Sequence, residues 1–186
     1  AKVADMQGDY PSAQGYARES LSLAEEVGNQ QGKAIALNRL GRIARQLGNI
    51  MQAKSLHEQG LAYARAIHNA PITAFTLNKL GEVAADEGDY QTALNLHSDA
   101  LRRNREMNDP YYIADNLCYL AAVSLKLGAL DDTEAYIRES LELAAKINAL
   151  VVLFQIFDCW AEWFNSQRQF ERAAELVGFI VHHPAV

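Results

Sequence analysis

The sequence is poor in the features that mark secreted and membrane proteins. Its two cysteines, Cys118 and Cys159, are too few for a disulfide framework, so we expect reduced thiols. The longest apolar stretch, around 149–157, is interrupted by Gln155 and followed by Asp158, and is shorter than the roughly 20 residues that cross a bilayer. We find no secretory signal peptide. These absences predict a cytoplasmic protein without a membrane partner.

Positive charge is also scarce. The chain has 17 Lys and Arg against 23 Asp and Glu, a net charge of -6, so direct binding to nucleic acid is not expected. The small basic cluster of Arg102, Arg103 and Arg105 is interpreted as ordinary surface on a helix. The hydrophobic share of 49% is nevertheless enough for a well-packed protein.

What the sequence does contain is an internal repeat of about 40 residues, a length typical of a repeat array. Its clearest markers are evenly spaced glycines, each followed by a turn residue and an apolar one: Gly8, Gly48, Gly88 and Gly128. Large apolar residues recur at the same period in two columns: Leu37, Leu77, Leu117, Phe157 and Leu40, Leu80, Leu120, Trp160. Small residues recur beside them and in a further column, Ala13, Ala53, Ala93, Thr133 and Ala173.

Each repeat is predicted to be a helical hairpin with a turn at the glycine, since glycine suits the left-handed residue that ends a helix. The first helices are expected at 31–47, 71–87, 111–127 and 150–167. The second helices are expected at 10–27, 50–67, 90–107, 130–147 and 170–182. The fold class is therefore all-α, a right-handed superhelical solenoid of such hairpins.

We expect one repeat domain over 1–186, with about four and a half hairpins: 1–27 in part, 31–67, 71–107, 111–147 and 150–182. The chain opens within a helix, and His182-His183-Pro184 ends the last one early, so we interpret it as a fragment of a larger protein. The last unit is rich in aromatic residues, among them Trp160 and Trp163. They are expected to be covered by a cap or a following domain, to seal the last hairpin, or to make an end-to-end contact between copies of the chain.

The repeat resembles the tetratricopeptide repeat, on the strength of Leu37, Leu40, Gly41, Gly48 and Ala53 at its marker positions. The segments Ala36 to Gly41 and Thr76 to Gly81 are especially similar to the repeat region of bacterial signal-transduction ATPases and LuxR-type regulators of the maltose-regulator class. The resemblance implies a non-catalytic sensor or scaffold module that binds a peptide, a small inducer or a partner protein. The alternatives are the regulatory arm of a signal-transduction ATPase and a free-standing peptide sensor.

In such arrays the first helices line a concave binding surface. Carrying over its positions gives the candidate binding residues Asn38, Arg42, Arg45, Phe75, Asn78, Glu82, Asp115, Asp158 and Glu162. The carboxamides of Asn38 and Asn78 are expected to hydrogen-bond an extended peptide backbone. Because residues 31–70 hold six Lys or Arg against one acid, we expect a groove with its anion-binding end at Arg42 and its cation-binding end near Asp158. Simple solvation of helix faces is the alternative.

No catalytic group and no cofactor or metal site is expected. His57 and His97 fall in one column of the second helices, where a packed imidazole at the edge of the core is favoured over a metal ligand.

Overall fold

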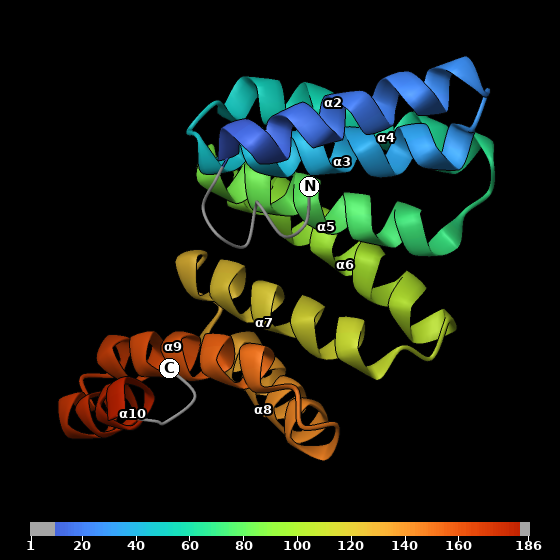
Figure 1. Ribbon diagram of the computed structural model, residues 1–186. Coiled ribbons are helices and arrows are strands. Elements are labelled where there is room, and N and C mark those ends of the chain that lie inside the picture. Colours follow the sequence, from blue (N-terminus) through green and yellow to red (C-terminus); the bar gives the residue numbers. More distant parts are fainter. Residues whose placement is uncertain (1–9, 183–186) are drawn as a thin grey trace. The chain divides into compact units, whose positions relative to one another are not determined.

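A computed structural model describes residues 10–182 of the chain, with side chains described as far as Gly178. In this range there are nine helices and no strand: α2 (Tyr10–Glu26), α3 (Gln30–Gln46), α4 (Ile50–Ala66), α5 (Ala70–Asp86), α6 (Tyr90–Glu106), α7 (Pro110–Lys126), α8 (Leu130–Lys146), α9 (Leu150–Ser166) and α10 (Phe170–His182) (Figure 1). The all-α repeat fold is thus confirmed. The sequence-based predictions for 1–7, Gly8 and the stop at His183-Pro184 lie outside the described residues.

The helices α2 to α9 are equal in length, and each is joined to the next helix by a short turn. The middle residue of every one of these turns is left-handed. Four of these residues are glycines, with φ between 66° and 79°: Gly28, Gly48, Gly88 and Gly128. The other four are His68, Asn108, Asn148 and Arg168, with φ between 52° and 59°. The turns therefore recur at half the spacing of the marker glycines, which occupy every second turn.

Hydrogen bonds explain why each helix stops where it does. After α2, the amide of Gly28 donates to Glu25 O at 3.2 Å and that of Asn29 to Ala24 O at 2.8 Å, the pattern of a Schellman motif. Asn29 also begins the next helix, because its Oδ1 accepts from the Gly32 amide at 2.9 Å. Asn69 and Asp109 likewise donate their backbone amides to the preceding helix and accept an amide of the next helix through their side-chain oxygens.

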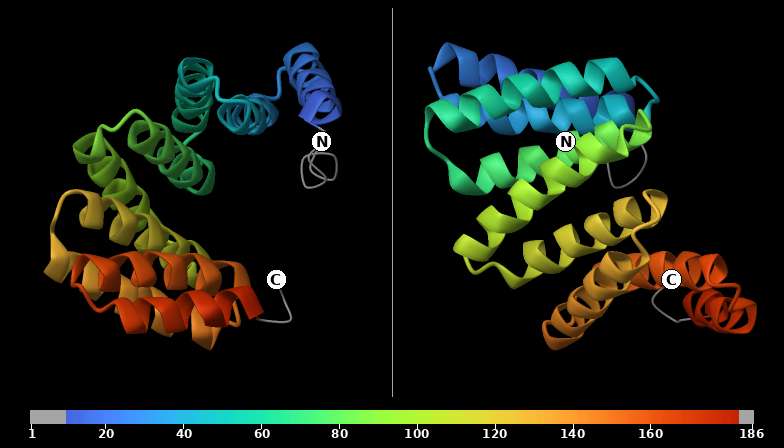
Figure 2. Two further views of the ribbon diagram at one scale, coloured as in Figure 1. Left: turned by 90° about the vertical axis from the view of Figure 1, so that its left-hand side faces the viewer. Right: turned by 180° about the vertical axis from the view of Figure 1, so that it is seen from behind.

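Two compact units make up the chain, residues 1–103 and 104–186, and each is described by itself. In unit 1, α3 packs against α2 and α4 and also touches α5, the first helix of the next hairpin. In unit 2, α7 likewise contacts α8 and α9. Figure 2 shows α3 and α4 side by side in unit 1. A single repeat domain over 1–186 stays a prediction.

The predicted apolar columns form the core of both units. Leu37, Leu77 and Leu117 are at most 3% exposed, whereas Phe157 in the last hairpin is only partly buried. Ala13, Ala53 and Ala93 are completely buried, which fits the predicted close crossing of helices. Among the described residues, no helix is long and apolar enough to cross a membrane.

Candidate functional site

Asn38 is buried between three helices. It lies on α3, is 3% exposed, and its Nδ2 donates to Thr76 Oγ1 on α5 at 2.7 Å. Its Oδ1 lies 2.9 Å from His57 Nδ1 on α4. The Thr76 hydroxyl donates to Ile72 O at 2.7 Å, so the amide must use its nitrogen for Thr76 and its oxygen for His57. His57 is therefore the donor through Nδ1.

The next repeat contains the same arrangement. Asn78 is 3% exposed, and its Oδ1 lies 2.5 Å from Nδ1 of the fully buried His97. Burial lowers the pKa of His57 from 6.5 to about 4, against the opposing charge of Glu82. Burial likewise lowers the pKa of His97 to about 3. Both imidazoles are neutral at pH 7 and belong to the core, deeper than the edge position expected for them.

Glycine makes room for each imidazole. A Cβ added at Gly41 would lie 2.7 Å from Cε1 and Nε2 of His57, and one added at Gly81 would lie 2.6 Å from the same atoms of His97. We call Asn38, Gly41 and His57, with Asn78, Gly81 and His97, the two Asn–Gly–His modules. In unit 2 the corresponding residues are Cys118, Ala121 and Ile137, which pack together in an apolar cluster.

Charged candidates of unit 1 meet on neighbouring first helices. The Arg45 guanidinium on α3 reaches Glu82 at 2.6 Å and Asp86 at 2.5 and 3.1 Å, both on α5. Glu82 is 7% exposed and also accepts from Lys79. Burial lowers the pKa of Arg42, while the charge of Glu82 opposes that shift. Arg45 and Lys79 are thus paired with Glu82 and Asp86.

We use the term first-helix face for the side of α3 and α5 that carries Arg42, Arg45, Phe75, Lys79 and Asp86. Phe75 is half-buried, and the Lys79 ammonium lies 5.3 Å from the centre of its ring. Asn38 and Asn78 lie in the predicted columns on the same helices, but their carboxamides are used inside the protein. The predicted role of Asn38 and Asn78 in ligand binding stays a prediction, and their burial disfavours direct contact with a ligand.

The candidates of unit 2 lie on α7 and α9. Lys126 Nζ on α7 is 3.2 Å from Glu162 Oε2 on α9, and both side chains are more than half exposed. Burial, with smaller contributions from Cys159, Asp115 and Asp158, raises the pKa of Cys118. Burial also raises the pKa of Cys159 to about 12. Both cysteines are free and buried, so their thiols are poor nucleophiles at neutral pH.

The aromatic residues of the last hairpin pack on their own unit. Trp160 stacks on Phe164 with ring centres 5.7 Å apart and an interplanar angle of 14°. Trp163 Nε1 donates to Leu130 O at 3.2 Å, and its ring packs with Trp160 against the apolar cluster of unit 2. Phe170 differs, because it is 63% exposed.

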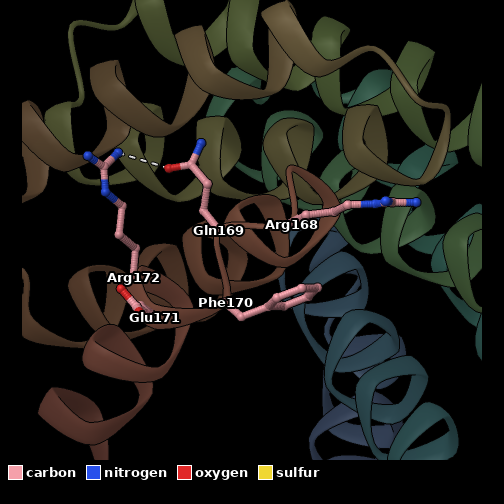
Figure 3. A pocket seen from close by; sticks show the side chains of 5 residues that line it. All are labelled: Arg168, Gln169, Phe170, Glu171 and Arg172. Carbon is pink, nitrogen blue, oxygen red and sulfur yellow. Dashed lines mark hydrogen bonds between the residues drawn. The ribbon is translucent and has the colours of Figure 1, made fainter.

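Two surface hollows lie away from the candidates. One is lined by residues of the α9–α10 turn, where Arg172 donates to Gln169 at 2.9 Å and Arg168 extends in another direction (Figure 3). The other, of about 370 Å³, lies between α2 and α3 beside Leu23 and Val27. The predicted binding residues line neither. Within residues 10–182, no three His, Cys, Asp or Glu side chains form a group that would hold a metal.

The fold and the turns define the class of protein: an array of α-helical hairpins in which, within each unit, neighbouring first helices contact one another. The family model of the tetratricopeptide repeat matches residues 1–66 and 32–106. The chain therefore belongs to the tetratricopeptide repeat family. Among curated proteins, no sequence is similar enough to count as a relative.

Solved structures share this fold at low sequence identity. BtubC (BKLC) from P. vanneervenii has a TM-score of 0.77 and 15% identity, over 95% of this chain and 74% of that one. Aspartyl phosphate phosphatase F from Bacillus subtilis has a TM-score of 0.79 and 12% identity, over 96% and 56%. A Rap protein complexed with Competence and Sporulation Factor has a TM-score of 0.71 and 17% identity, over 93% and 58%. The similarity to these proteins concerns the fold.

Proposed function

We propose that the chain is a non-catalytic binding module that captures a peptide or a segment of a partner protein on its first helices. The observation that carries this proposal is the first-helix face of unit 1, where Arg45 bridges Glu82 and Asp86 across two repeats. Arginine and aromatic side chains are enriched at interfaces. Ion pairs between helices hold this surface in place before a ligand arrives, which lowers the ordering cost of binding.

Arg42 is the side chain best suited to contact a ligand there. It is half-buried on α3, one turn from Arg45, and its guanidinium retains a positive charge at pH 7 despite the burial that lowers its pKa. Arginine in such a position holds carboxylates through two parallel hydrogen bonds. The ligand that suits this face carries an acidic group followed by an apolar side chain, which would lie against Phe75.

The parent protein, in this proposal, is a bacterial signalling or transcription regulator in which the module senses a peptide or small inducer. The repeat segments Ala36 to Gly41 and Thr76 to Gly81 support that origin by their resemblance to the maltose-regulator class. A structural neighbour in complex with Competence and Sporulation Factor supports a signalling ligand. If the parent is an ATPase with this module as its regulatory arm, its full-length sequence will contain a phosphate-binding loop.

The test is a selection of ligands from a random peptide library displayed on phage, with the full chain as bait. Peptides that bind the first-helix face should lose at least about tenfold in affinity for the Arg42→Glu variant. Arg65→Glu on the exposed side of α4 is the matched control, because it makes the same charge change on a second helix. Equal loss in both variants, or none in Arg42→Glu, would contradict the proposal.

A further inference from the structure

The two Asn–Gly–His modules place ionisable side chains where a positive charge is costly. His57 is completely buried, and its Nδ1 is already engaged with Asn38. Its Nε2 has no hydrogen-bond partner among the described residues. The ring edge that carries Nε2 lies close to Gly41, where even a Cβ would be only 2.7 Å from Nε2. A proton on Nε2 would create a buried N–H and a buried positive charge together.

Burial is the main cause that disfavours this proton, and the charged groups around His57 act in both directions. Arg45 on α3 and Lys79 on α5 are cationic and disfavour it, while Glu82 on α5 favours it. Glu82 forms ion pairs with both Arg45 and Lys79, which compensate its negative charge. His97 is flanked by Lys79, which adds to the effect of burial. Lys79 thus lowers the pKa of both imidazoles, and acid is expected to affect the two modules in the same way.

Unit 2 has no such group in the corresponding position. Ile137 occupies the place of the imidazole and is completely buried, with Cys118 in the place of the asparagine and Ala121 in that of the glycine. The three replacements occur together for a steric reason. The methyl group of Ala121 is tolerated on α7 because no imidazole ring packs against the helix at that point. Protonation between pH 4 and 7 therefore has no counterpart at this position of unit 2.

We propose that unit 1 contains a pH-sensitive switch: the Asn38–His57 and Asn78–His97 pairs keep it folded at neutral pH, and protonation of the imidazoles opens it on acidification while unit 2 stays folded. The folded state holds the neutral imidazole, and the unfolded chain binds the proton more readily. Stability is thus full above pH 6.5 and is lost as the pH falls toward 4. For a pKa lowered from 6.5 to about 4, His57 alone reduces the folding equilibrium constant up to about 300-fold.

The sequence offers a probe for each unit. Both tryptophans, Trp160 and Trp163, lie in unit 2, whereas circular dichroism at the helix band reports on both units. In an acid titration of the full chain, we expect helical signal to be lost at a higher pH than the change in tryptophan emission. Coincident transitions would overturn the proposal, because they would mean that unit 2 opens with unit 1.

A variant separates the histidines from the carboxylates that protonate over the same range. Asn38→Cys, Gly41→Ala and His57→Ile give the first module the residues of unit 2, and the same three changes are made at Asn78, Gly81 and His97. With both modules replaced, the early loss of helical signal should disappear. An unchanged acid transition would overturn the proposal.

Nuclear magnetic resonance of the wild-type rings gives a check that does not depend on the folding of this variant. The two buried rings should remain neutral, with the proton on Nδ1, at every pH at which unit 1 is folded. Titration of these rings near pH 6.5 in the folded chain would overturn the proposal.

Discussion

Gly41→Ala is the substitution for which the structure gives the sharpest expectation. Alanine normally stabilises a helix interior relative to glycine by about 0.5–1 kcal/mol. At position 41, however, the new methyl group would lie 2.7 Å from two atoms of His57. The ring cannot move aside without giving up its bond to Asn38 in a completely buried site. Overpacking of this kind typically costs about 1–3 kcal/mol, so we expect a net destabilisation of about 1–2 kcal/mol.

Gly15→Ala is the matched control. Gly15 also lies within a helix, but an added Cβ meets nothing within 4 Å, so this variant should be more stable by about 0.5–1 kcal/mol. The assay is urea unfolding followed by circular dichroism. In a His57→Ile background the cost of Gly41→Ala should vanish, and the difference between the two backgrounds measures the clash. Stabilisation by Gly41→Ala equal to that by Gly15→Ala, with His57 present, would refute the clash.

Two further predictions concern an ion pair and a turn. Arg45→Ala leaves the buried Glu82 with Lys79 as its remaining cation and should cost about 1–3 kcal/mol in urea unfolding. Arg105→Ala, whose partner is exposed, should cost less than about 1 kcal/mol, and equal costs would argue against a special role for Arg45. Arg168→Gly should raise the melting temperature, because residue 168 is left-handed with φ 59° and glycine adopts that conformation without strain. Gly128→Ala in the equivalent turn should lower the melting temperature for the same reason. The opposite order of the two melting temperatures would contradict this explanation.

The helices were predictable from sequence because their ends depend on local chemistry. The predicted ranges agree with the structure to within one residue. In four of the turns an Asn or Asp that caps one helix follows the left-handed residue that ends the previous one: Asn29, Asn69, Asp89 and Asp109. The turns between hairpins were harder to recognise than those within them. Between hairpins the left-handed residue is not always glycine, and Asn108 or Asn148 adopts the same conformation at little cost.

The orientation of the asparagines was not predictable from their columns alone. Spacing places Asn38 and Asn78 on the first helices but does not say whether the carboxamide points outward or toward the second helix. One signal was available within the chain: the asparagine, the glycine and the histidine of a module are all replaced together in the fourth repeat, by Cys118, Ala121 and Ile137. Contact between the three side chains explains why they change together.

A repeat protein also needs its hairpins to pair correctly, and the buried polar groups of unit 1 bear on this. The helices have nearly the same length and the same turns, so apolar packing alone discriminates weakly between neighbouring registers. Asn38 contacts His57 and Thr76 only when α3, α4 and α5 are in one register, and any slip leaves the buried Asn38 and His57 side chains without these partners. The modules therefore specify register in unit 1, and their neutral imidazoles make that specificity depend on pH.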